Sequence, residues 1–305
     1  MQTRPTAATA AGRSGKKDRS SKNKSMKVLI AGMGLIGGSF ALSLRDHELA
    51  EEILGVENSE EHAAEALGLG LADRMVTFEE GLAEADLVVL ATPADTIPLM
   101  AVKALNRVNE RQVVMDMGSI KGELCEVISM HAHRGRFVAA HPMWGTEYSG
   151  PKAAQRGAFT GRSVVLCDTV HSDKDALAVV ERIFRTLGCP AVYMDPEEHD
   201  LHAAYISHIS HVTSFALALT VLEKEREERH IFDLAGGGFE STVRLAKSSA
   251  ATWVPILLQN KYNVLDVLRE HIHQLQIMRR MLERDDAEGL CNAIERANTI
   301  QRIIH

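Results

Sequence analysis

The chain has 305 residues, which is enough for two domains of ordinary size. Hydrophobic residues make up 45% and charged residues 25% of it, as in soluble globular proteins, and no uninterrupted apolar run reaches the roughly 20 residues that cross a bilayer. The formal net charge of −7 disfavours nucleic acid as the main partner, and the four cysteines form no CxxC pair, which disfavours a structural zinc site or disulfide framework. These features predict a soluble protein of the reducing cytoplasm, with no membrane or nucleic-acid partner.

The first 25 residues differ from the rest of the chain. They hold seven basic side chains and one acidic side chain, with almost no large apolar residues. A segment of this composition cannot bury a core, so residues 1–25 are predicted to form a disordered basic tail. A solvated tail is favoured over a targeting segment or a nucleic-acid contact.

Seven short apolar runs alternate with segments of helical periodicity over residues 26–195. Their Val, Ile and Leu content is typical of strands buried on both faces, which predicts a doubly wound, mostly parallel α/β sheet of the Rossmann type. The runs are residues 27–31, 53–56, 87–91, 113–116, 137–140, 163–167 and 191–194. Helical spacing is found between the early runs, at residues 35–44 and 59–67.

Residues 196–305 carry no strand-like run. Two long stretches, 201–228 and 253–282, have helical periodicity, so this part is predicted to be an all-α domain. The second stretch holds more apolar residues than one amphipathic helix needs, at positions 265, 268, 272, 275, 278, 281 and 282. This surplus favours a homodimer built on these helices over a monomeric helical core.

The most specific motif is a glycine-rich turn between the first strand and the helix that follows it. Gly32 allows the tight turn, Gly34 lets the backbone approach a pyrophosphate, and Gly37 lets the helix pack close to the strand. Leu35 and Ile36 lie in the same turn and are expected to contact the cofactor as well. The context of strand, turn and helix predicts a dinucleotide site.

Glu57, Thr92 and Pro93 are expected to contact the same cofactor. Glu57 lies 20 positions past Gly37, where a carboxylate accepts hydrogen bonds from the adenosine ribose and repels a 2′-phosphate. This position favours NAD over NADP without excluding NADP. Thr92 and Pro93 follow the next apolar run, and loops at the carboxyl ends of strands face the ligand in such folds.

Four further residues have the chemistry of a reaction centre. His141 follows a strand, where an imidazole can take a proton from a hydroxyl as hydride leaves. His208 and His211 share one helix face; that spacing could bind a metal, but no third ligand stands at a partner spacing, so none is expected. Arg244 follows three glycines and could bind a carboxylate with two hydrogen bonds.

Together these motifs resemble the prephenate dehydrogenase family of tyrosine biosynthesis, which includes arogenate dehydrogenases. The resemblance covers residues 26–305 and rests on six segments in family order: 32–39, 91–93, 118–121, 141–147, 206–211 and 236–244. It implies NAD-dependent oxidative decarboxylation of prephenate to 4-hydroxyphenylpyruvate.

The resemblance also implies roles for individual residues. His141 is similar to the family's catalytic histidine, which accepts the proton of the ring hydroxyl, and Ser119 would hold that hydroxyl and orient the histidine. Arg244 would bind a substrate carboxylate, and His208 would lie nearer the nicotinamide. Further substrate-binding positions would be His211, Thr146, Glu147 and Trp253.

Three alternatives remain open from the sequence. The substrate could be arogenate, which has an amino group where prephenate has a keto group. The chain could be a β-hydroxyacid-type dehydrogenase that uses Lys247 or Lys261, although neither lysine explains His141 and Ser119. It could also be a non-catalytic Rossmann module that senses the NAD redox state.

Overall fold

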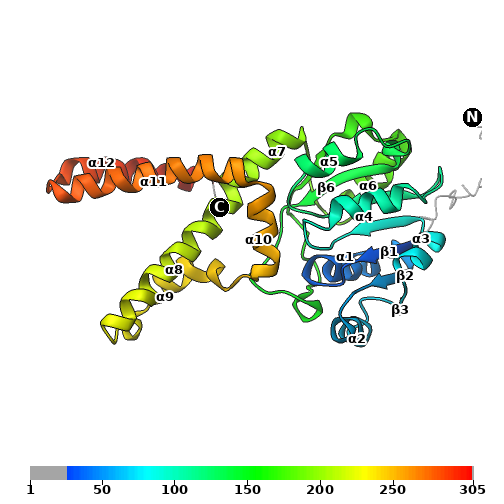
Figure 1. Ribbon diagram of the computed structural model, residues 1–305, viewed down its shortest axis with the longest axis horizontal. Helices are drawn as coiled ribbons and strands as arrows, with labels where there is room; N and C mark the ends of the chain where they lie inside the picture. The colour runs from blue at the N-terminus through cyan, green and yellow to red at the C-terminus, as the bar shows by residue number, and fades with distance from the viewer. Residues whose placement is uncertain (1–25, 304–305) are drawn as a thin grey trace, which may run out of the picture.

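The computed structural model describes residues 26–303, so the predicted basic tail over residues 1–25 lies outside the described residues. The described chain has two parts (Figure 1). One is a sheet covered by helices, and the other is an elongated group of helices that extends away from the sheet.

The strands of the first part form one eight-stranded sheet in the order β3-β2-β1-β4-β5-β6-β7-β8. Neighbouring strands are parallel except β6 and β7, which are antiparallel, so the predicted Rossmann-type sheet is confirmed. Only the short β3 was not predicted, because its two residues form no apolar run. The bounds are β1 Met26–Ala31, β2 Ala50–Val56, β3 Arg74–Met75, β4 Leu87–Leu90, β5 Val113–Asp116, β6 Phe137–Pro142, β7 Val164–Cys167 and β8 Ala191–Met194.

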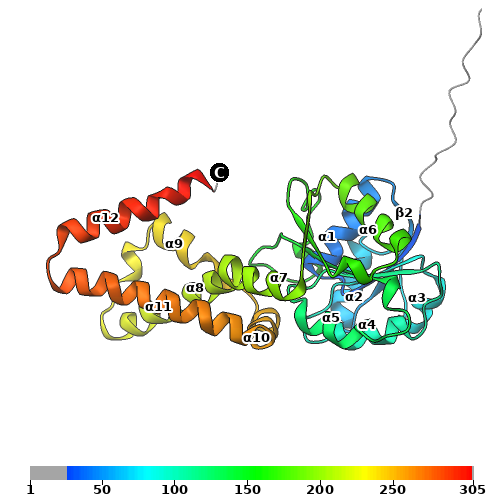
Figure 2. The ribbon, with the colours of Figure 1, turned by 90° about the horizontal axis from the view of Figure 1, so that it is seen from above.

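Helices cover both faces of the sheet (Figure 2). Val28 of β1 points into a core with α1, α2 and α6, whereas the next residue, Leu29, points into a core with α3, α4 and α5. This alternation explains why the central strands, such as β1 and β4, are apolar along almost their whole length. The bounds are α1 Leu35–Asp46, α2 Glu60–Gly68, α3 Phe78–Glu84, α4 Ile97–Leu105, α5 Gly122–Ile128 and α6 Lys174–Thr186, with 3₁₀ turns η1 Arg134–Arg136, η2 Pro151–Ala153 and η3 Thr169–His171.

The second part is helical over the described residues, as predicted. Its elements are α7 Pro196–Ala203, the π-helical turn η4 Ala204–His208, α8 Ile209–Glu227, η5 Phe232–Leu234, α9 Gly237–Val243, η6 Arg244–Lys247, α10 Ala250–Gln259, α11 Lys261–Glu283, α12 Ala287–Asn298 and η7 Thr299–Arg302. The stretch of helical periodicity over 253–282 is helical but is divided between α10 and α11, because the chain turns at Asn260. The Asn260 side chain makes hydrogen bonds to other parts of the chain, and asparagine tolerates helix ends well.

The long helix α11 leaves much of its predicted apolar stripe exposed in the single chain. Leu275 is 53% and Leu282 is 64% exposed, and Leu265, Ile272 and Met278 are exposed as well. An apolar face of this length is typical of a protein–protein contact.

One helical stretch, Pro196–Glu227, is long and apolar enough to cross a membrane by length and composition alone. The expectation from the sequence was that no uninterrupted apolar run is long enough to cross a bilayer. That expectation counted uninterrupted apolar residues, whereas this stretch reaches a mean hydropathy of 1.3 with histidines and serines among its apolar residues. It also carries His208 and His211, which line the pocket described next.

Candidate active site

A pocket of about 490 Å³ lies between the carboxyl ends of the strands and the helical part of the chain. Its walls come from the turn after β1, the loops after β4, β5 and β6, and the helical segments around η4, η6 and α10. Most of the predicted site residues line it: Gly34, Leu35, Ile36, Thr92, Pro93, Ser119, His141, Thr146, Glu147, His208, His211 and Trp253. Four predicted site residues are not part of the pocket wall and are described below: Gly32, Gly37, Glu57 and Arg244.

The glycine-rich turn has the shape that a dinucleotide requires. Gly32 has φ +93°, and a Cβ there would lie 2.4 Å from the carbonyl oxygen of Ala91. A Cβ on Gly37 would lie 1.9 Å from the carbonyl oxygen of Gly32, so neither position admits a side chain. A Cβ on Gly34 would instead meet only the backbone nitrogen of Gly150, at 4.0 Å, and within the described residues no side chain caps the start of α1. The first N–H groups of α1 are therefore free to bind a pyrophosphate in the space before Gly34.

Glu57 lies directly after β2 and is held against this turn. Its carboxylate accepts hydrogen bonds from the backbone N–H groups of Met33, Asn58 and Ser59, at 3.2, 3.0 and 3.3 Å. These contacts fix a negative charge beside the turn, on the side where the ribose of a dinucleotide lies in this fold.

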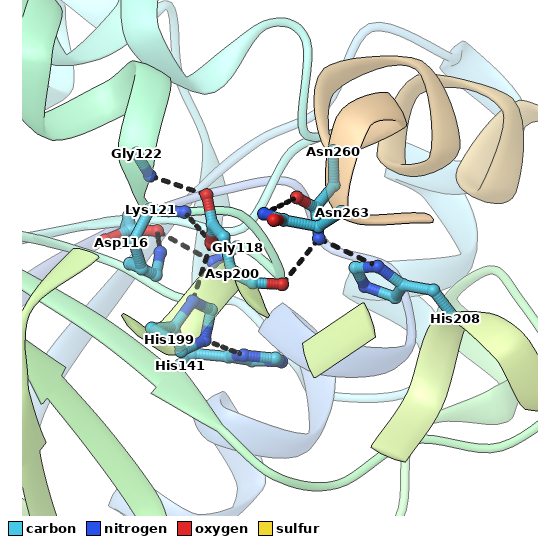
Figure 3. Close-up of polar contacts among 10 residues, drawn as sticks. All are labelled: Asp116, Gly118, Lys121, Gly122, His141, His199, Asp200, His208, Asn260 and Asn263. Carbon is cyan, nitrogen blue, oxygen red and sulfur yellow. Dashed lines mark hydrogen bonds and ion pairs between the residues drawn. The ribbon is translucent and has the colours of Figure 1, made fainter. Parts of the chain in front are cut away.

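His141, in β6, is the end of a chain of buried polar contacts (Figure 3). Its Nδ1 lies 2.8 Å from Nε2 of His199, and Nδ1 of His199 lies 2.7 Å from Oδ1 of Asp200. The Asp200 carboxylate also accepts hydrogen bonds from the backbone N–H groups of Lys121 and Gly122, at 2.9 and 2.8 Å. The second nitrogen of His141, Nε2, is left for a ligand.

The pKa of His141 lies well below its ordinary value. Burial is the main cause, and the neighbouring His199, Lys121 and His208 act in the same direction. The imidazole is therefore neutral near pH 7, which is the state that can accept a proton.

A buried ion pair fixes the loop that carries Ser119. Lys121 and Asp116 are both fully buried, and their side chains contact each other. Asp116 also accepts hydrogen bonds from the N–H groups of Gly118 and Ala140, at 2.8 and 3.1 Å. Asp116 therefore ties the loop after β5 to β6, and this places Ser119 and His141 in the same pocket wall.

Two histidines and one tryptophan form the wall from the helical part. The ring of His211 stacks on Trp253 with 3.4 Å between ring centroids, and His208 meets the same indole edge-on at 5.9 Å. Nδ1 of His208 accepts from the Asn260 amide at 3.1 Å, so its proton lies on Nε2. Burial lowers the pKa of His208 to about 4, and it lowers the pKa of His211 too. Within residues 26–303 no three His, Cys, Asp or Glu side chains are grouped so as to hold a metal ion.

Arg244 lies at the edge of the pocket, in an ion pair. Its Nη1 lies 2.6 Å from Oε2 of Glu147, and its side chain is 49% exposed. The pKa of Glu147 is lowered, first by a backbone hydrogen bond and then by Arg244. The guanidinium thus stands beside the pocket, and its contact with a substrate carboxylate stays a prediction.

The sequence did not identify His199 and Asp200 as site residues. They follow Pro196 and two glutamates at the start of α7, a composition typical of a solvated helix end. In the structure both are buried, at 2% and 6% exposure. Their one signal is a histidine beside an aspartate, which is too common in sequences to be specific.

The lysines of the β-hydroxyacid alternative lie elsewhere. Lys247 is exposed and lies 3.9 Å from Glu240, and Lys261 lies over the ring of Tyr262. Among the described residues the pocket wall contains no lysine. Nothing in this wall supports that alternative.

Comparison with known proteins accounts for both parts of the chain. The family model described as prephenate dehydrogenase, nucleotide-binding domain, matches residues 40–193, and the model described as prephenate dehydrogenase, dimerization domain, matches residues 195–296. The chain belongs to the prephenate dehydrogenase family. The predicted resemblance is thereby confirmed.

Members of the prephenate dehydrogenase family are similar to the chain over most of its length. Prephenate dehydrogenase of Bacillus subtilis is 34% identical over 266 residues, which are 86% of this chain and 72% of that protein. Cyclohexadienyl dehydrogenase of Zymomonas mobilis is 28% identical over 265 residues, 86% of this chain and 90% of that protein. Prephenate dehydrogenase of A. aeolicus, solved in complex with hydroxyphenyl propionate and NAD+, has a TM-score of 0.83 at 32% identity and covers 92% of this chain and 98% of its own.

Proposed function

We propose that the chain catalyses the NAD-dependent oxidative decarboxylation of prephenate to 4-hydroxyphenylpyruvate in tyrosine biosynthesis. One observation carries the proposal: His141 is neutral, its Nδ1 is engaged by His199, and its Nε2 is left for a ligand in a pocket beside the glycine-rich turn. Membership of the prephenate dehydrogenase family and the likeness to an NAD+ complex support it.

The proposed cofactor contacts come from three loops and one helix. NAD, when bound, accepts the hydride from the ring carbon that bears the hydroxyl. The turn with Gly32, Gly34 and Gly37 binds the pyrophosphate through backbone N–H groups, with Leu35 and Ile36 beside it, and Glu57 binds the ribose. Thr92, Pro93 and His208 line the part of the pocket proposed for the nicotinamide.

His141 is proposed as the base of the reaction. Its Nε2 accepts the proton of the ring hydroxyl as the hydride leaves, and Ser119 hydrogen-bonds the same oxygen. The ring carboxylate then leaves as CO2, and the electrons of the broken carbon–carbon bond make the ring aromatic. The proton returns to the ring oxygen, so the reaction converts prephenate and NAD+ into 4-hydroxyphenylpyruvate, CO2 and NADH without net proton release.

The other pocket residues are proposed to hold the substrate. Trp253 and the His211 stacked on it offer a flat apolar wall with one polar edge to the substrate. Thr146 and Glu147 line the pocket beside Arg244, whose guanidinium is the cation proposed to bind a substrate carboxylate.

Arg244→Gln is expected to raise KM for prephenate about tenfold to a hundredfold with a smaller change in kcat, because one charge-assisted contact to a carboxylate is lost. Steady-state kinetics at saturating NAD measure this. Arg107→Gln is the control, since it removes a guanidinium from an exposed ion pair with Glu79 outside the pocket. A loss confined to kcat in Arg244→Gln, or an equal rise of KM in both variants, would mean that Arg244 does not bind the carboxylate.

Glu57→Ala is expected to lower the preference for NAD over NADP at least about tenfold, because a charged hydrogen bond to the ribose and the repulsion of a 2′-phosphate are both lost. The ratio of kcat/KM for the two cofactors measures the preference. Glu57→Gln keeps one acceptor for the turn and separates this effect from a loosened backbone. The role of Glu57 is refuted by an unchanged ratio.

Two copies of the chain are proposed to form a homodimer in the cytoplasm. The match to a dimerization domain over residues 195–296 and the exposed apolar face of α11 support this. Residues 26–195 are proposed as the nucleotide-binding unit, with residues 196–305 carrying the substrate and subunit contacts.

The deciding experiment is to follow the appearance of reduced nicotinamide with prephenate or arogenate, each with NAD and with NADP. Turnover with prephenate and NAD is the expected result. Turnover with arogenate alone would keep the mechanism and change the substrate. Protein that binds NAD but turns over none of the four combinations would refute the proposed function in favour of an NAD sensor.

A further inference from the structure

We propose that His199 and Asp200 are positioning residues that hold the proton of His141 on Nδ1 and so keep Nε2 free as the base. The inference rests on the proposed function, in which His141 accepts the proton of the substrate hydroxyl. Its basis is the buried row of contacts from His141 through His199 to the Asp200 carboxylate (Figure 3).

The direction of hydrogen bonding along this row starts at Asp200. The backbone N–H groups of Lys121 and Gly122 can only donate, and both point at its carboxylate, at 2.9 and 2.8 Å. Asp200 therefore acts as an acceptor, and Nδ1 of His199, at 2.7 Å, donates to it. A neutral His199 that has its proton on Nδ1 presents Nε2 as an acceptor.

The contact between His199 and His141 follows from this arrangement. Nε2 of His199 faces Nδ1 of His141 at 2.8 Å, so Nδ1 of His141 must donate. The lone pair of His141 is thereby placed on Nε2. The opposite direction would require a second proton on His199 or a proton on Asp200, and it would leave His141 with Nε2–H, which cannot accept a proton from a substrate.

The row is anchored at Asp200, which is held from several elements. Asp200, in α7, binds the first residues of α5, and its backbone carbonyl accepts from the Asn260 amide at 2.7 Å. Asn260 donates from the same nitrogen to His208. The rings of His141 and His199 are 5.0 Å apart, at 71°. Rotation of either ring would break a buried hydrogen bond, which is unfavourable.

The charges around His141 fit this role. The titratable groups near it are His199 and Asp200 from α7, Asp116 from the end of β5, Lys121 from the loop after β5, and His208 from η4. The positive charge of Lys121 is balanced by the carboxylate of Asp116. The carboxylate connected to His141 through hydrogen bonds is therefore Asp200, by way of His199. A hydrogen bond that strengthens when His141 becomes charged stabilises the state in which the proton has been taken.

The test compares His199→Leu with His199→Gln. Leucine removes the acceptor for His141 Nδ1–H, whereas the glutamine amide oxygen can reach the place of His199 Nε2. In His199→Leu we expect kcat to fall roughly tenfold to a hundredfold at nearly unchanged KM for prephenate and Kd for NAD, as part of the contribution of the base is lost. We expect the acidic limb of kcat/KM to move to lower pH by roughly half a unit to one unit. His199 lowers the pKa of His141 only as a second positive charge, whereas the neutral His199 of this row accepts a hydrogen bond from the charged form of His141 and stabilises it. His199→Gln should recover most of kcat and the wild-type limb.

A matched control is His131→Leu. His131 is half-buried, hydrogen-bonded to Asn106 and outside the pocket, so the variant should leave kcat and the pH limb unchanged. A merely structural role of His199 would reduce the rate equally at all pH values and leave the limb in place. That result, or equal rates in His199→Leu and His199→Gln, overturns the inference.

A second measurement uses the wild-type chain and does not depend on any variant of His199. Nitrogen-15 correlation spectra report which ring nitrogen of a neutral histidine carries the proton, and the His141 signals are those absent from His141→Asn. The proton is expected on Nδ1; a proton on Nε2 overturns the inference. If wild-type protein makes no NADH from prephenate, the proposed function fails instead, and the spectra still decide the tautomer.

Discussion

His141→Asn is expected to lower kcat for prephenate by about 10²–10⁴-fold and to leave KM for prephenate near its wild-type value. The loss follows from the position of the two imidazole nitrogens. Asparagine can still donate to His199 from its amide, so the pocket wall is kept, but no group remains at the place of Nε2. Steady-state kinetics and a direct NAD titration measure the two quantities separately.

His131→Asn is the matched control, because it makes the same change at a half-buried histidine outside the pocket. It should leave kcat unchanged. If His141→Asn retained more than about a tenth of wild-type kcat, general base catalysis by His141 would contribute less than this class of group supplies, and another acceptor would have to be sought.

Much of the nucleotide-binding fold was predictable because its causes are local. Gly32 has a positive φ, and a Cβ on Gly37 would meet the carbonyl oxygen of Gly32, so both glycines are needed within one turn. The apolar runs are equally local, since a strand covered on both faces must be apolar along its whole length. For this reason the predicted strands agree with the buried strands β1 and β4 to β7 and with the buried part of β2. The exposed β8 was predicted from its apolar composition alone, and β3, with Arg74 and Met75, gave no signal.

The parts of the site that the sequence did not predict depend on contacts between distant segments. Asp200 acts by accepting from Lys121, 79 positions earlier in the chain. Arg244 was expected to face a substrate, but its partner in the structure is Glu147, 97 positions away. The end of α10 at Asn260 also depends on distant segments, because the Asn260 amide donates hydrogen bonds to the backbone carbonyl of Asp200 and to Nδ1 of His208. Periodicity reports on one element at a time and carries no information on such pairs.

Lys121→Met is expected to lower the free energy of unfolding by about 3–5 kcal/mol, the largest stability effect of any substitution considered for this chain. Methionine fills the volume of the lysine stem, but Asp116 is left as a fully buried carboxylate without its cation. Chemical denaturation at neutral pH measures the loss. Lys152→Met removes a lysine from the exposed ion pair with Glu65 and should cause no measurable change.

The loss of unfolding free energy in Lys121→Met, relative to wild type, should grow as the pH rises. Burial already raises the pKa of Asp116 in the folded chain, with Lys121 and two backbone N–H groups opposing the rise. Removing Lys121 raises that pKa further above the unfolded value of about 3.9, so the folded variant binds a proton that the unfolded chain releases. Its stability relative to wild type is therefore greatest at low pH and is lost as the pH rises through the raised folded pKa.

A double-mutant cycle of Asp116→Asn and Lys121→Met tests whether the two side chains act as a pair. The asparagine removes the uncompensated charge and can still accept from Gly118 or Ala140, so the double variant should be more stable than Lys121→Met alone at neutral pH and should lose its pH-dependent deficit. Additive losses in the cycle, or a deficit of Lys121→Met that grows as the pH falls, would show that the pair does not act through the buried charge of Asp116. In that case the loop with Ser119 would be held by its backbone contacts alone.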